Sequence, residues 1–469
     1  MASSRHEACV IGAGPGGYVA AIRLAQLGKK VVLVDRDRLG GTCLNYGCIP
    51  SKALIAAGTL YDRMKGAAEM GITAEAVRLD MAKLRQWKDG VVQKLGNGIA
   101  QLIKMNGIEL VLGDARFTGT RSLEVKTHKG TVQTVEAEQF IIATGGRPIE
   151  IPGLHFDGKT IISSKESLDF DEVPKRLLVV GGGVIGLELG TFFAKVGSQV
   201  TVVELMPQLL PGVDLDLVQI VQRSLKKRGV AIHLEAKVKS ATVLGDGTAR
   251  VAVETKKGDI SLEFDKVLVC VGVKPNTETL NLEAIGVQLN EKKFIKVDAT
   301  LRTNLGNVFA IGDVTGGPLL AHRASKQGIV AAEALAGRRS AYDVRAMPGA
   351  IFTDPEVATV GMNEAEAEKA GYKPRVGKFP FAASGRALST GETEGFVKVI
   401  TDQASDIILG VAIVGPEASN LIAEAALAIE MGATAEDLSL TVHAHPTLPE
   451  ALMEASEAVH GRAIHIFAK

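Results

Sequence analysis

The sequence carries no excess of charge of either sign. Its 53 lysines and arginines balance 53 aspartates and glutamates, so the formal net charge is zero. A neutral chain offers no electrostatic reason to bind nucleic acid or an anionic membrane surface. The sequence also lacks any apolar run near the roughly 20 residues that a membrane-spanning helix needs. We therefore expect neither nucleic acid nor a membrane among its partners.

A signal-peptide pattern is missing as well. Residues 1–7 are mostly polar, and a strand-like apolar run, residues 8–11, follows them directly. No apolar stretch of the kind that a secretory signal requires comes before that run. The expected location is therefore cytoplasmic.

Cysteine is scarce, with four residues in a chain of 469. So few cysteines cannot form a disulfide framework, and in a reducing compartment a close pair is more often catalytic or metal-binding. Cys9 and Cys270 lie in apolar, strand-like runs, and we interpret both as small buried hydrophobic residues. Cys43 and Cys48 lie close together in a glycine-rich segment instead, which makes them candidates for chemistry.

A glycine-rich motif, G-x-G-x-x-G, occurs twice, at residues 12–17 and 181–186. Each copy follows an apolar strand-like run and opens a helical pattern. An acid follows the first glycine by 23 residues in both copies, Asp35 in one and Glu204 in the other. One such motif alone is weak evidence, but this context is the fingerprint of a dinucleotide site. The alternative, two glycine-rich turns that bind nothing, requires two accidental matches.

Each glycine of the fingerprint has its own role. The first permits a tight turn, the second lets the backbone approach a pyrophosphate, and the third lets the helix pack against the strand. The helix N-terminus then faces the phosphate charge, and the acid accepts hydrogen bonds from ribose hydroxyls. In this order the glycines are Gly12, Gly14 and Gly17 in the first copy and Gly181, Gly183 and Gly186 in the second.

The rest of the chain predicts further elements around these two sites. A helical stretch is expected at residues 52–107 and short strands at residues 108–142. A strand then runs into a tight crossover at residues 140–148, and a matching strand and turn recur at residues 266–275. Another strand is expected at residues 307–311. The turn residues that we expect to face a nucleotide are Thr144, Gly145, Gly272, Gly312 and Asp313.

The predicted fold class is α/β. Two Rossmann-like dinucleotide-binding domains precede a C-terminal α+β domain, where strands alternate with alanine-rich helices and no dinucleotide signature occurs. The expected boundaries are residues 1–150 and 151–275 for the two binding domains, 276–344 for a central domain that completes the first site, and 345–469 for the C-terminal domain.

The spacing of Cys43 and Cys48 constrains their geometry. A thiol pair just after the acid of a dinucleotide site is well placed to face the redox ring of that nucleotide. A disulfide needs Cα atoms within about 7 Å, whereas five residues along a regular helix rise about 7.5 Å. Bridging therefore requires a distorted helix start, and strained disulfides are the more reducible kind. The alternatives are two unpaired thiols or half of a zinc site, although no further ligands occur at metal spacing, so we expect no metal.

The chain resembles the dihydrolipoamide dehydrogenase family, the E3 components of 2-oxo acid dehydrogenase complexes. The resemblance covers essentially the full length. The motif at residues 43–52, Cys-Leu-Asn-x-Gly-Cys-Ile-Pro-Ser-Lys, is more specific than the general disulfide-reductase pattern. The chain departs from the family at Tyr46, where a smaller aliphatic residue is usual, and at residues 325–327, where acidic residues are common. The other matching motifs are residues 12–17, 143–148, 181–190, 310–314 and 443–450.

The resemblance implies FAD in the first fingerprint and NAD in the second. Asp35 would hold the adenosine ribose of FAD and Asp313 its ribityl chain, with Thr42 also at the cofactor. In the second site, Glu204 accepts from the ribose 2′-hydroxyl of NAD and repels the 2′-phosphate of NADP. Residues 205–208 include no arginine that could receive that phosphate, which favours NAD.

The resemblance also assigns roles to the cysteine pair. Cys48 would lie against the flavin as a thiolate, and Cys43 would be the interchange thiol that meets the substrate. Lys52 would lie by the flavin, paired with Glu188 from the second domain. The residues alone leave open that Lys52 is a solvated helix residue.

Residues 443–450 supply a candidate base, because dithiol oxidation needs a proton acceptor. An imidazole, whose ordinary pKa lies near neutrality, suits that role. From the residues alone, a histidine in this proline-rich loop could equally be structural. The family position favours His445 as the base, with Glu450 orienting its far ring nitrogen, and leaves His443 as structural.

The implied activity is oxidation of protein-bound dihydrolipoamide to lipoamide, with NAD⁺ as the final acceptor. The resemblance also implies a homodimer formed through the C-terminal domain, His445 supplied by the partner chain, and the lipoyl domain of an E2 acyltransferase as partner. One alternative is a sister enzyme that reduces glutathione disulfide or mercuric ion, but mercuric reductases typically carry a further C-terminal cysteine pair, and no cysteine follows Cys270. Another is a docking subunit without catalysis, against which the complete cysteine and His–Glu pairs argue.

Overall fold

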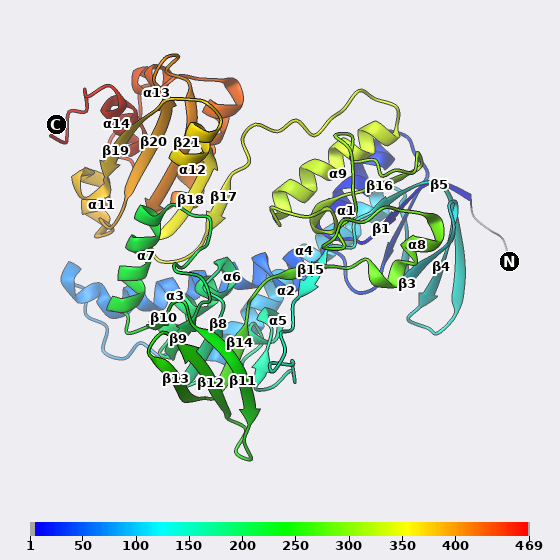
Figure 1. Cartoon of the computed structure of the whole chain (residues 1–469), viewed down its shortest axis with the longest axis horizontal. Coiled ribbons are helices and arrows are strands. Elements are labelled where there is room, and N and C mark those ends of the chain that lie inside the picture. The colour runs from blue at the N-terminus through cyan, green and yellow to red at the C-terminus, as the bar shows by residue number, and fades with distance from the viewer. Residues whose placement is uncertain (1–4, 468–469) are drawn as a thin grey trace.

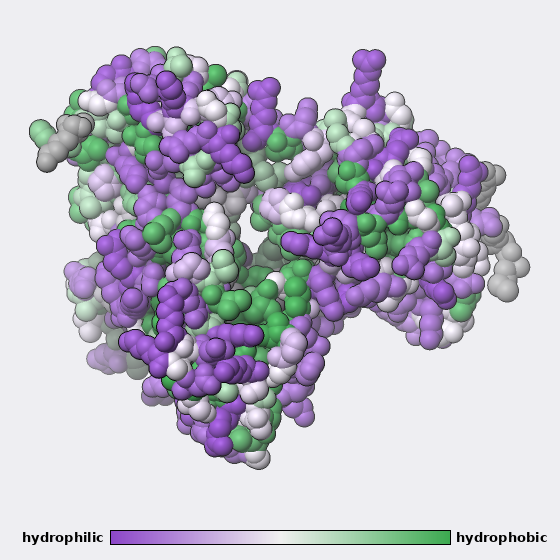
Figure 2. All heavy atoms as spheres, viewed as in Figure 1, coloured by the Kyte–Doolittle hydropathy of each residue, from purple (hydrophilic) through white to green (hydrophobic). Residues whose placement is uncertain are grey.

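The computed structural model describes residues 5–467, so the first four residues of the polar N-terminal segment, and residues 468–469, lie outside the described part. The chain forms three regions, each with its own sheet (Figure 1). In Figure 2, hydrophobic residues gather beside the hollow at the centre of the view, where these regions meet. Within residues 5–467, no helix is both long and apolar enough to cross a bilayer.

The first region is built on a six-stranded sheet. Its strands are β1 (Arg5–Ile11), β2 (Val31–Asp35), β3 (Glu109–Gly119), β4 (Ser122–Thr127), β5 (Val132–Ile142) and β16 (Val308–Ala310). The sheet order is β1-β2-β3-β4-β5-β16, with an added pairing of β1 to β5. β1 is parallel to β2 and β5, while the far ends of β3 and β5 continue into an antiparallel meander with β4.

Residues distant in sequence complete this region. Helix α1 (Pro15–Gln26) packs against α9 (Ala321–Leu335) so closely that a β-carbon on Gly328 would lie 2.5 Å from the carbonyl oxygen of Gly16. Strand β16 pairs with β5 at the sheet edge. Short elements fill the space between them: η2 (Glu278–Leu280), α8 (Leu282–Ile285) and η3 (Gly312–Thr315). The predicted central domain, residues 276–344, thus extends the first sheet, while its exact boundaries stay a prediction.

The helical stretch predicted at residues 52–107 is wrong in its continuity. It is divided among α3 (Cys48–Gly66), η1 (Ala67–Met70) and α4 (Met81–Met105), and a short helix, α2 (Gly41–Tyr46), precedes it. Gly71, with φ of +77°, ends the first part, because this left-handed conformation suits glycine. Asp80 caps the second part by accepting a hydrogen bond from the Lys83 N–H at 3.0 Å.

The second region has the predicted parallel sheet. Its strands are β7 (Ile161–Ile162), β8 (Arg176–Val180), β9 (Gln199–Val203), β10 (Ala231–His233) and β14 (Lys266–Val269), in the order β10-β9-β8-β14-β7. Its helices are α5 (Ser164–Ser167), α6 (Val184–Lys195) and α7 (Leu215–Lys227). A separate antiparallel meander consists of β11 (Lys237–Val243), β12 (Ala249–Thr255) and β13 (Gly258–Phe264). Short strands β6 (Gly146–Pro148) and β15 (Val273–Pro275) pair antiparallel where the chain crosses between the first two regions.

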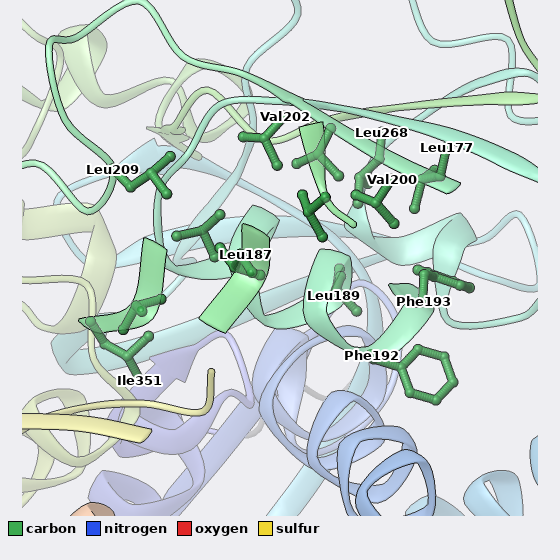
Figure 3. Packing of buried hydrophobic residues seen from close by; sticks show 14 of the residues in the cluster. Leu177, Leu187, Leu189, Phe192, Phe193, Val200, Val202, Leu209, Leu268 and Ile351 are labelled. Carbon is green, nitrogen blue, oxygen red and sulfur yellow. The ribbon is translucent and has the colours of Figure 1, made fainter. Parts of the chain in front are cut away.

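Helix α6 is the centre of the largest hydrophobic cluster. Leu187, Leu189, Phe192 and Phe193 of this helix belong to the cluster, which Figure 3 shows together with strand residues such as Val200 and Leu268. Ile351 of the third region joins the same cluster. At roughly 1.5–3 kcal/mol for each large apolar side chain buried, this cluster holds α6, and with it the second fingerprint, in place.

The third region is the predicted C-terminal α+β domain. Its antiparallel strands are β17 (Gly349–Ile351), β18 (Glu356–Gly361), β19 (Pro374–Pro380), β20 (Phe396–Asp402) and β21 (Ile408–Gly415), in the order β17-β18-β21-β20-β19. Its helices are α10 (Glu364–Lys369), η4 (Phe381–Ala383), α11 (Gly385–Thr390), α12 (Ala418–Met431), α13 (Ala435–Leu440) and α14 (Glu450–Val459). Leu421, Ile422 and Ala425 of α12 pack into its core.

Candidate active site

The first fingerprint forms the turn that the glycines predict. Gly12 has φ of +104°, and a β-carbon on it would lie 2.3 Å from the Ala143 carbonyl oxygen. A β-carbon on Gly17 would lie 1.8 Å from the Gly12 carbonyl oxygen, so only glycine lets α1 pack on the turn. Gly14 is the N-cap of α1, and the nearest atom to its missing β-carbon is Gly41 Cα, 3.9 Å away. The turn therefore has no room for a side chain at Gly12 and Gly17, whereas the backbone at Gly14 is open.

The second fingerprint repeats this geometry. Gly181 also has φ of +104°, and its missing β-carbon would lie 2.5 Å from the Cys270 carbonyl oxygen. A β-carbon on Gly186 would lie 2.4 Å from the Gly181 carbonyl oxygen, whereas one on Gly183 would meet no atom within 4 Å. Both helix N-termini therefore present open backbone to the space in front of them, as a pyrophosphate requires.

The two acids are fixed by backbone donors. Asp35 accepts hydrogen bonds from the N–H of Ala13 at 2.5 Å and of Asp37 at 2.7 Å. Burial raises the pKa of Asp35 above its ordinary value, and these hydrogen bonds lower it in part. Glu204 is buried, and it accepts from the N–H of Gly182 at 2.6 Å and from that of Met206 at 2.7 Å. Each carboxylate is thus held at the end of its strand, where a ribose would bind.

One continuous cavity of about 2030 Å³ connects both sites. Gly17 and Gly186 are not among its lining residues, consistent with their packing role behind the turns. The predicted site residues that line it are Gly12, Gly14, Asp35, Thr42, Cys43, Cys48, Lys52, Thr144, Gly145, Gly181, Gly183, Glu188, Glu204, Gly272, Gly312 and Asp313. The open glycine cradles and the two fixed acids fit two dinucleotides, FAD and NAD, that meet in this space.

The crossovers between the regions are locked by reciprocal hydrogen bonds. The Thr144 hydroxyl donates to the Asn276 carbonyl at 2.8 Å, and the Asn276 amide donates back to the Thr144 carbonyl at 2.9 Å. The Asn276 N–H also donates to the Gly145 carbonyl, at 2.9 Å. Sequence analysis missed Asn276, although an amide directly after the second crossover was an available signal. This lock fixes how the two nucleotide sites face each other.

The turn at Gly312 and Asp313 closes the first site from the other side. The Gly312 N–H donates to the buried Gln327 side chain at 2.7 Å. Gln327 belongs to the segment that departs from the family's acidic pattern, and here a neutral amide serves as acceptor. Burial raises the pKa of Asp313, while the guanidinium of Arg323 lowers it in part. Asp313 lines the cavity, as predicted for a residue that meets FAD.

The cysteines lie on either side of the predicted helix distortion. Cys43 lies in α2, Cys48 is the first residue of α3, and Gly47 between them (φ −144°, ψ −112°) breaks the helix. A β-carbon on Gly47 would lie 3.1 Å from the Thr42 carbonyl oxygen, so a small residue suits this break. The two thiols are unlinked and hydrogen-bonded to each other.

The environment separates the two thiols chemically. The hydrogen bond to Cys48, together with burial, raises the pKa of Cys43 well above its ordinary value. The hydrogen bond from Cys43 lowers the pKa of Cys48 to about 7, with help from the Lys52 ammonium and against the effect of burial. Cys48 is therefore the thiol of the pair that ionises first, and Cys43 is the thiol that stabilises its thiolate. Both residues line the cavity, and Cys48 is the more exposed of the two.

Lys52 and Glu188 form the predicted pair across the first two regions. Lys52 Nζ lies 2.7 Å from Glu188 Oε2, and only 4% of Glu188 is exposed. The other carboxylate oxygen accepts from the Phe352 N–H at 2.9 Å, and the Lys52 ammonium lies 4.6 Å from the centre of the Phe352 ring. No sequence signal pointed to Phe352, because it belongs to the third region. All three residues line the cavity.

The remaining cysteines have no redox setting. Cys9 is fully buried, as predicted, and burial raises its pKa. Cys270 is only partly buried, because it lines the cavity behind the second fingerprint. Burial also raises the pKa of Cys270, to about 12, so it stays a thiol.

The two histidines near the C-terminus differ in what they can do. The Nδ1 of His445 lies 2.8 Å from Glu450, which leaves Nε2 free, and 80% of the side chain is exposed. Burial alone would raise the pKa of Glu450, but the Thr447 N–H and the imidazole outweigh it and keep the pKa low. The His443 side chain is buried, and its Nδ1 and Nε2 face Thr441 O and Glu424, so it offers no free nitrogen. Of these two histidines, His445 is therefore the one that presents a free ring nitrogen.

His445 and Glu450 do not line the cavity that holds the cysteines. They lie in the third region, which also carries exposed apolar side chains. Val442 is 95% exposed, and Leu427, Met431 and Leu440 are exposed as well. Within one chain, the base and the thiols are therefore not brought together.

Comparisons with known proteins agree with this architecture. The family model of the pyridine nucleotide-disulphide oxidoreductases matches residues 6–328, and that of the family's dimerisation domain matches residues 347–456. The crystal structure of LpdA from Mycobacterium tuberculosis superposes with a TM-score of 0.90 at 28% identity, covering 96% of this chain and 99% of that chain. The match to the dimerisation domain supports a homodimer.

Two curated relatives are similar over nearly the whole chain. The dihydrolipoyl dehydrogenase of Haloferax volcanii is 51% identical, over 98% of this chain and 97% of the relative. That of Geobacillus stearothermophilus is 48% identical, over 99% of this chain and 98% of the relative. The chain therefore belongs to the pyridine nucleotide-disulphide oxidoreductase family, among the dihydrolipoyl dehydrogenases.

Proposed function

We propose that this protein oxidises protein-bound dihydrolipoamide to lipoamide and reduces NAD⁺ to NADH. The observation that carries the proposal is the polarised pair of thiols, with the pKa of Cys48 lowered and that of Cys43 raised, in the cavity that joins the two fingerprints. Bound FAD supplies the step that no side chain can perform, because it accepts an electron pair from the dithiol and passes it as hydride to NAD⁺.

The thiol–disulfide half of the reaction follows from the residues. His445 takes a proton from one thiol of dihydrolipoamide, and the resulting thiolate attacks Cys43 Sγ. In the oxidised enzyme, where Cys43 and Cys48 would be joined as a disulfide, this attack breaks the Cys43–Cys48 bond, and Cys48 leaves as a thiolate, the form that its lowered pKa favours. The second substrate thiol then displaces Cys43 and transfers its proton to it, so lipoamide leaves with an intramolecular disulfide. The dithiol ends as Cys43–SH and Cys48–S⁻, with the other proton on His445.

Lys52 and Glu188 act in the other half of the reaction, the electron transfer from the dithiol to bound FAD. The Lys52 ammonium stabilises the Cys48 thiolate, and the Glu188 carboxylate fixes the ammonium at 2.7 Å. Because Glu188 is buried and the Phe352 ring lies over the Lys52 ammonium, the two charges are screened less than they would be in open water. We assign Lys52 to the position beside the flavin, where this charge can respond to electron transfer.

His445 acts across the dimer in this proposal. Its free Nε2 and large exposure suit a group that reaches into a partner's site, and it lies outside the cavity of its own chain. The third region also exposes the apolar side chains of Leu427, Met431, Leu440 and Val442, which burial against a second copy would remove from water. Each active site would then combine the thiols of one chain with the base of the other.

The partner substrate is proposed to be the lipoyl domain of an E2 acyltransferase. Dihydrolipoamide on a flexible carrier would have to reach Cys43, which is only partly buried. The relatives bear the name dihydrolipoyl dehydrogenase, which supports this substrate over glutathione.

A steady-state comparison of substrates tests the proposal. The purified enzyme is assayed with free dihydrolipoamide and with reduced glutathione, each with NAD⁺ and NADP⁺ in turn. Dihydrolipoamide with NAD⁺ should give the highest kcat/KM. Turnover of glutathione at a comparable rate, or no turnover of either thiol by flavin-loaded enzyme, would contradict it.

A further inference from the structure

Tyr46 lies between the two redox cysteines, at the position where the chain departs from the family pattern. It is the last residue of α2 and lines the cavity. Its hydroxyl donates to Asp37 Oδ2 at 2.6 Å. Burial and this hydrogen bond raise the pKa of Tyr46 to about 12, so the phenol stays protonated and remains a donor. None of the chemistry proposed above uses this residue.

The partner of Tyr46 belongs to the loop that borders the adenosine end of the first site. Asp37 N–H donates to Asp35 Oδ1 at 2.7 Å, so the two acids are linked directly. Arg36, Asp37 and Arg38 line the cavity. A contact that holds Asp37 therefore also limits how far the loop beside Asp35 can move.

The Tyr46 ring has a second anchor. Lys165 Nζ, from α5 of the second region, lies 4.3 Å from the ring centroid, within the range of a cation–π contact. Tyr46 thus connects the redox helix, the loop after Asp35 and the second nucleotide-binding region. A smaller aliphatic residue at this position could make neither contact.

We propose that Tyr46 is a positioning residue that closes the adenosine end of the FAD cleft. Its hydroxyl holds Asp37 toward α2, and FAD leaves only after this bond opens and the loop of residues 36–38 moves aside. A hydrogen bond to a carboxylate is stronger than one between neutral groups. The Tyr46–Asp37 bond therefore slows FAD release.

The test is the rate of FAD release from the intact holoenzyme, followed by the rise in fluorescence of free FAD. Tyr46→Phe removes only the hydroxyl and should release FAD about three- to tenfold faster. Tyr46→Val also loses the ring contact with Lys165 and should release it faster still. Circular dichroism on the same samples must show that release precedes unfolding. Tyr372→Phe, a half-exposed tyrosine of the third region outside the cavity, is the matched control and should match the wild type.

A double-mutant cycle distinguishes loss of the Tyr46–Asp37 hydrogen bond from a general destabilisation of the FAD site. Asp37→Ala should accelerate release as Tyr46→Phe does, and the double variant should be no faster than either alone. The proposal would be overturned if Tyr46→Phe released FAD at the wild-type rate. It would also be overturned if the rate increases of the two single variants multiplied fully in the double variant. The inference rests on FAD in the first fingerprint, which acid precipitation of the wild type tests separately by liberating FAD.

Discussion

The Lys52 ammonium lies 2.7 Å from the Glu188 carboxylate, and this contact joins the helix that begins at Cys48 to the helix of the second fingerprint. Glu188 is nearly enclosed, with 4% of it exposed, whereas 30% of the Lys52 side chain is exposed. Its two charges have opposite effects on Cys48: the Lys52 ammonium lowers the pKa of the thiol, and the Glu188 carboxylate raises it. The thiolate is therefore adjusted by a contact between two regions of the chain.

Changing either charge should move the Cys48 pKa in a defined direction. Lys52→Met removes the stabilising cation and should raise this pKa from about 7, by roughly one pH unit. Glu188→Gln removes the opposing anion and should lower it. The pH dependence of iodoacetamide alkylation of reduced enzyme measures both, with mass spectrometry identifying the modified cysteine. Lys65→Met, at the far end of the same helix, should change nothing; shifts in the same direction for both pair variants would refute the assignment.

The two cysteine variants should have opposite spectra. Cys48→Ser removes the thiolate expected beside the flavin, so no long-wavelength absorbance band should form on reduction. Cys43→Ser leaves Cys48 without a disulfide partner, so the band should be present before any reductant is added. Absorbance spectra of the two purified variants decide this. A band in Cys48→Ser and none in Cys43→Ser would reverse the roles of the two thiols.

Local constraints explain what the sequence could predict. The fingerprint turns depend on glycines whose missing β-carbons leave room for neighbouring backbone, as at Gly12 and Gly17, and this is encoded within a few residues. The helix distortion between Cys43 and Cys48 could be predicted because five residues of a regular helix rise further than the Cα–Cα distance that a disulfide allows. The pairing of Lys52 with Glu188 came from the resemblance, because nothing local in either segment specifies it.

Contacts between distant segments explain what the sequence could not predict. Phe352 reaches Lys52 only because the third region packs against α6, and Asn276 meets Thr144 only where two crossovers pair. The interruption between α3 and α4 was also missed, since the helical pattern hid the loop that begins at Gly71. Tertiary packing decides the first two contacts, whereas the interruption has local signals of its own in Gly71 and the capping residue Asp80.

The nicotinamide cofactor should be NAD rather than NADP. Both carboxylate oxygens of Glu204 are held by backbone N–H groups, so the side chain cannot easily turn away from a 2′-phosphate. We expect kcat/KM to be at least about 100-fold higher with NAD⁺, because juxtaposed like charges cost several kcal/mol. Glu204→Gln should lower this ratio of kcat/KM between NAD⁺ and NADP⁺. The control is Glu235→Gln, which should leave the ratio unchanged, because the Glu235 carboxylate pairs with Lys256 instead. Equal efficiencies in the wild type would contradict the role of Glu204.

The shared active site makes a prediction about mixed dimers. Cys43→Ser and His445→Gln chains should each be nearly inactive, because one lacks the interchange thiol and the other the base. The two proteins are mixed in equal amounts, unfolded, and allowed to reassemble with FAD. If His445 acts on the partner's thiols, each hybrid dimer has one doubly damaged site and one intact site. If it acts within its own chain, both hybrid sites carry one lesion.

Random reassembly makes half of the dimers hybrids, so the shared-site arrangement should restore about a quarter of the wild-type dihydrolipoamide activity. Each parent taken alone through the same unfolding and refolding is the control and should stay inactive. Different affinity tags on the two chains allow the hybrids to be isolated, where activity per dimer should reach about half of the wild type. Isolated hybrids without activity would mean that His445 serves its own chain, and its distance from the cysteine cavity would then require a large movement of the third region.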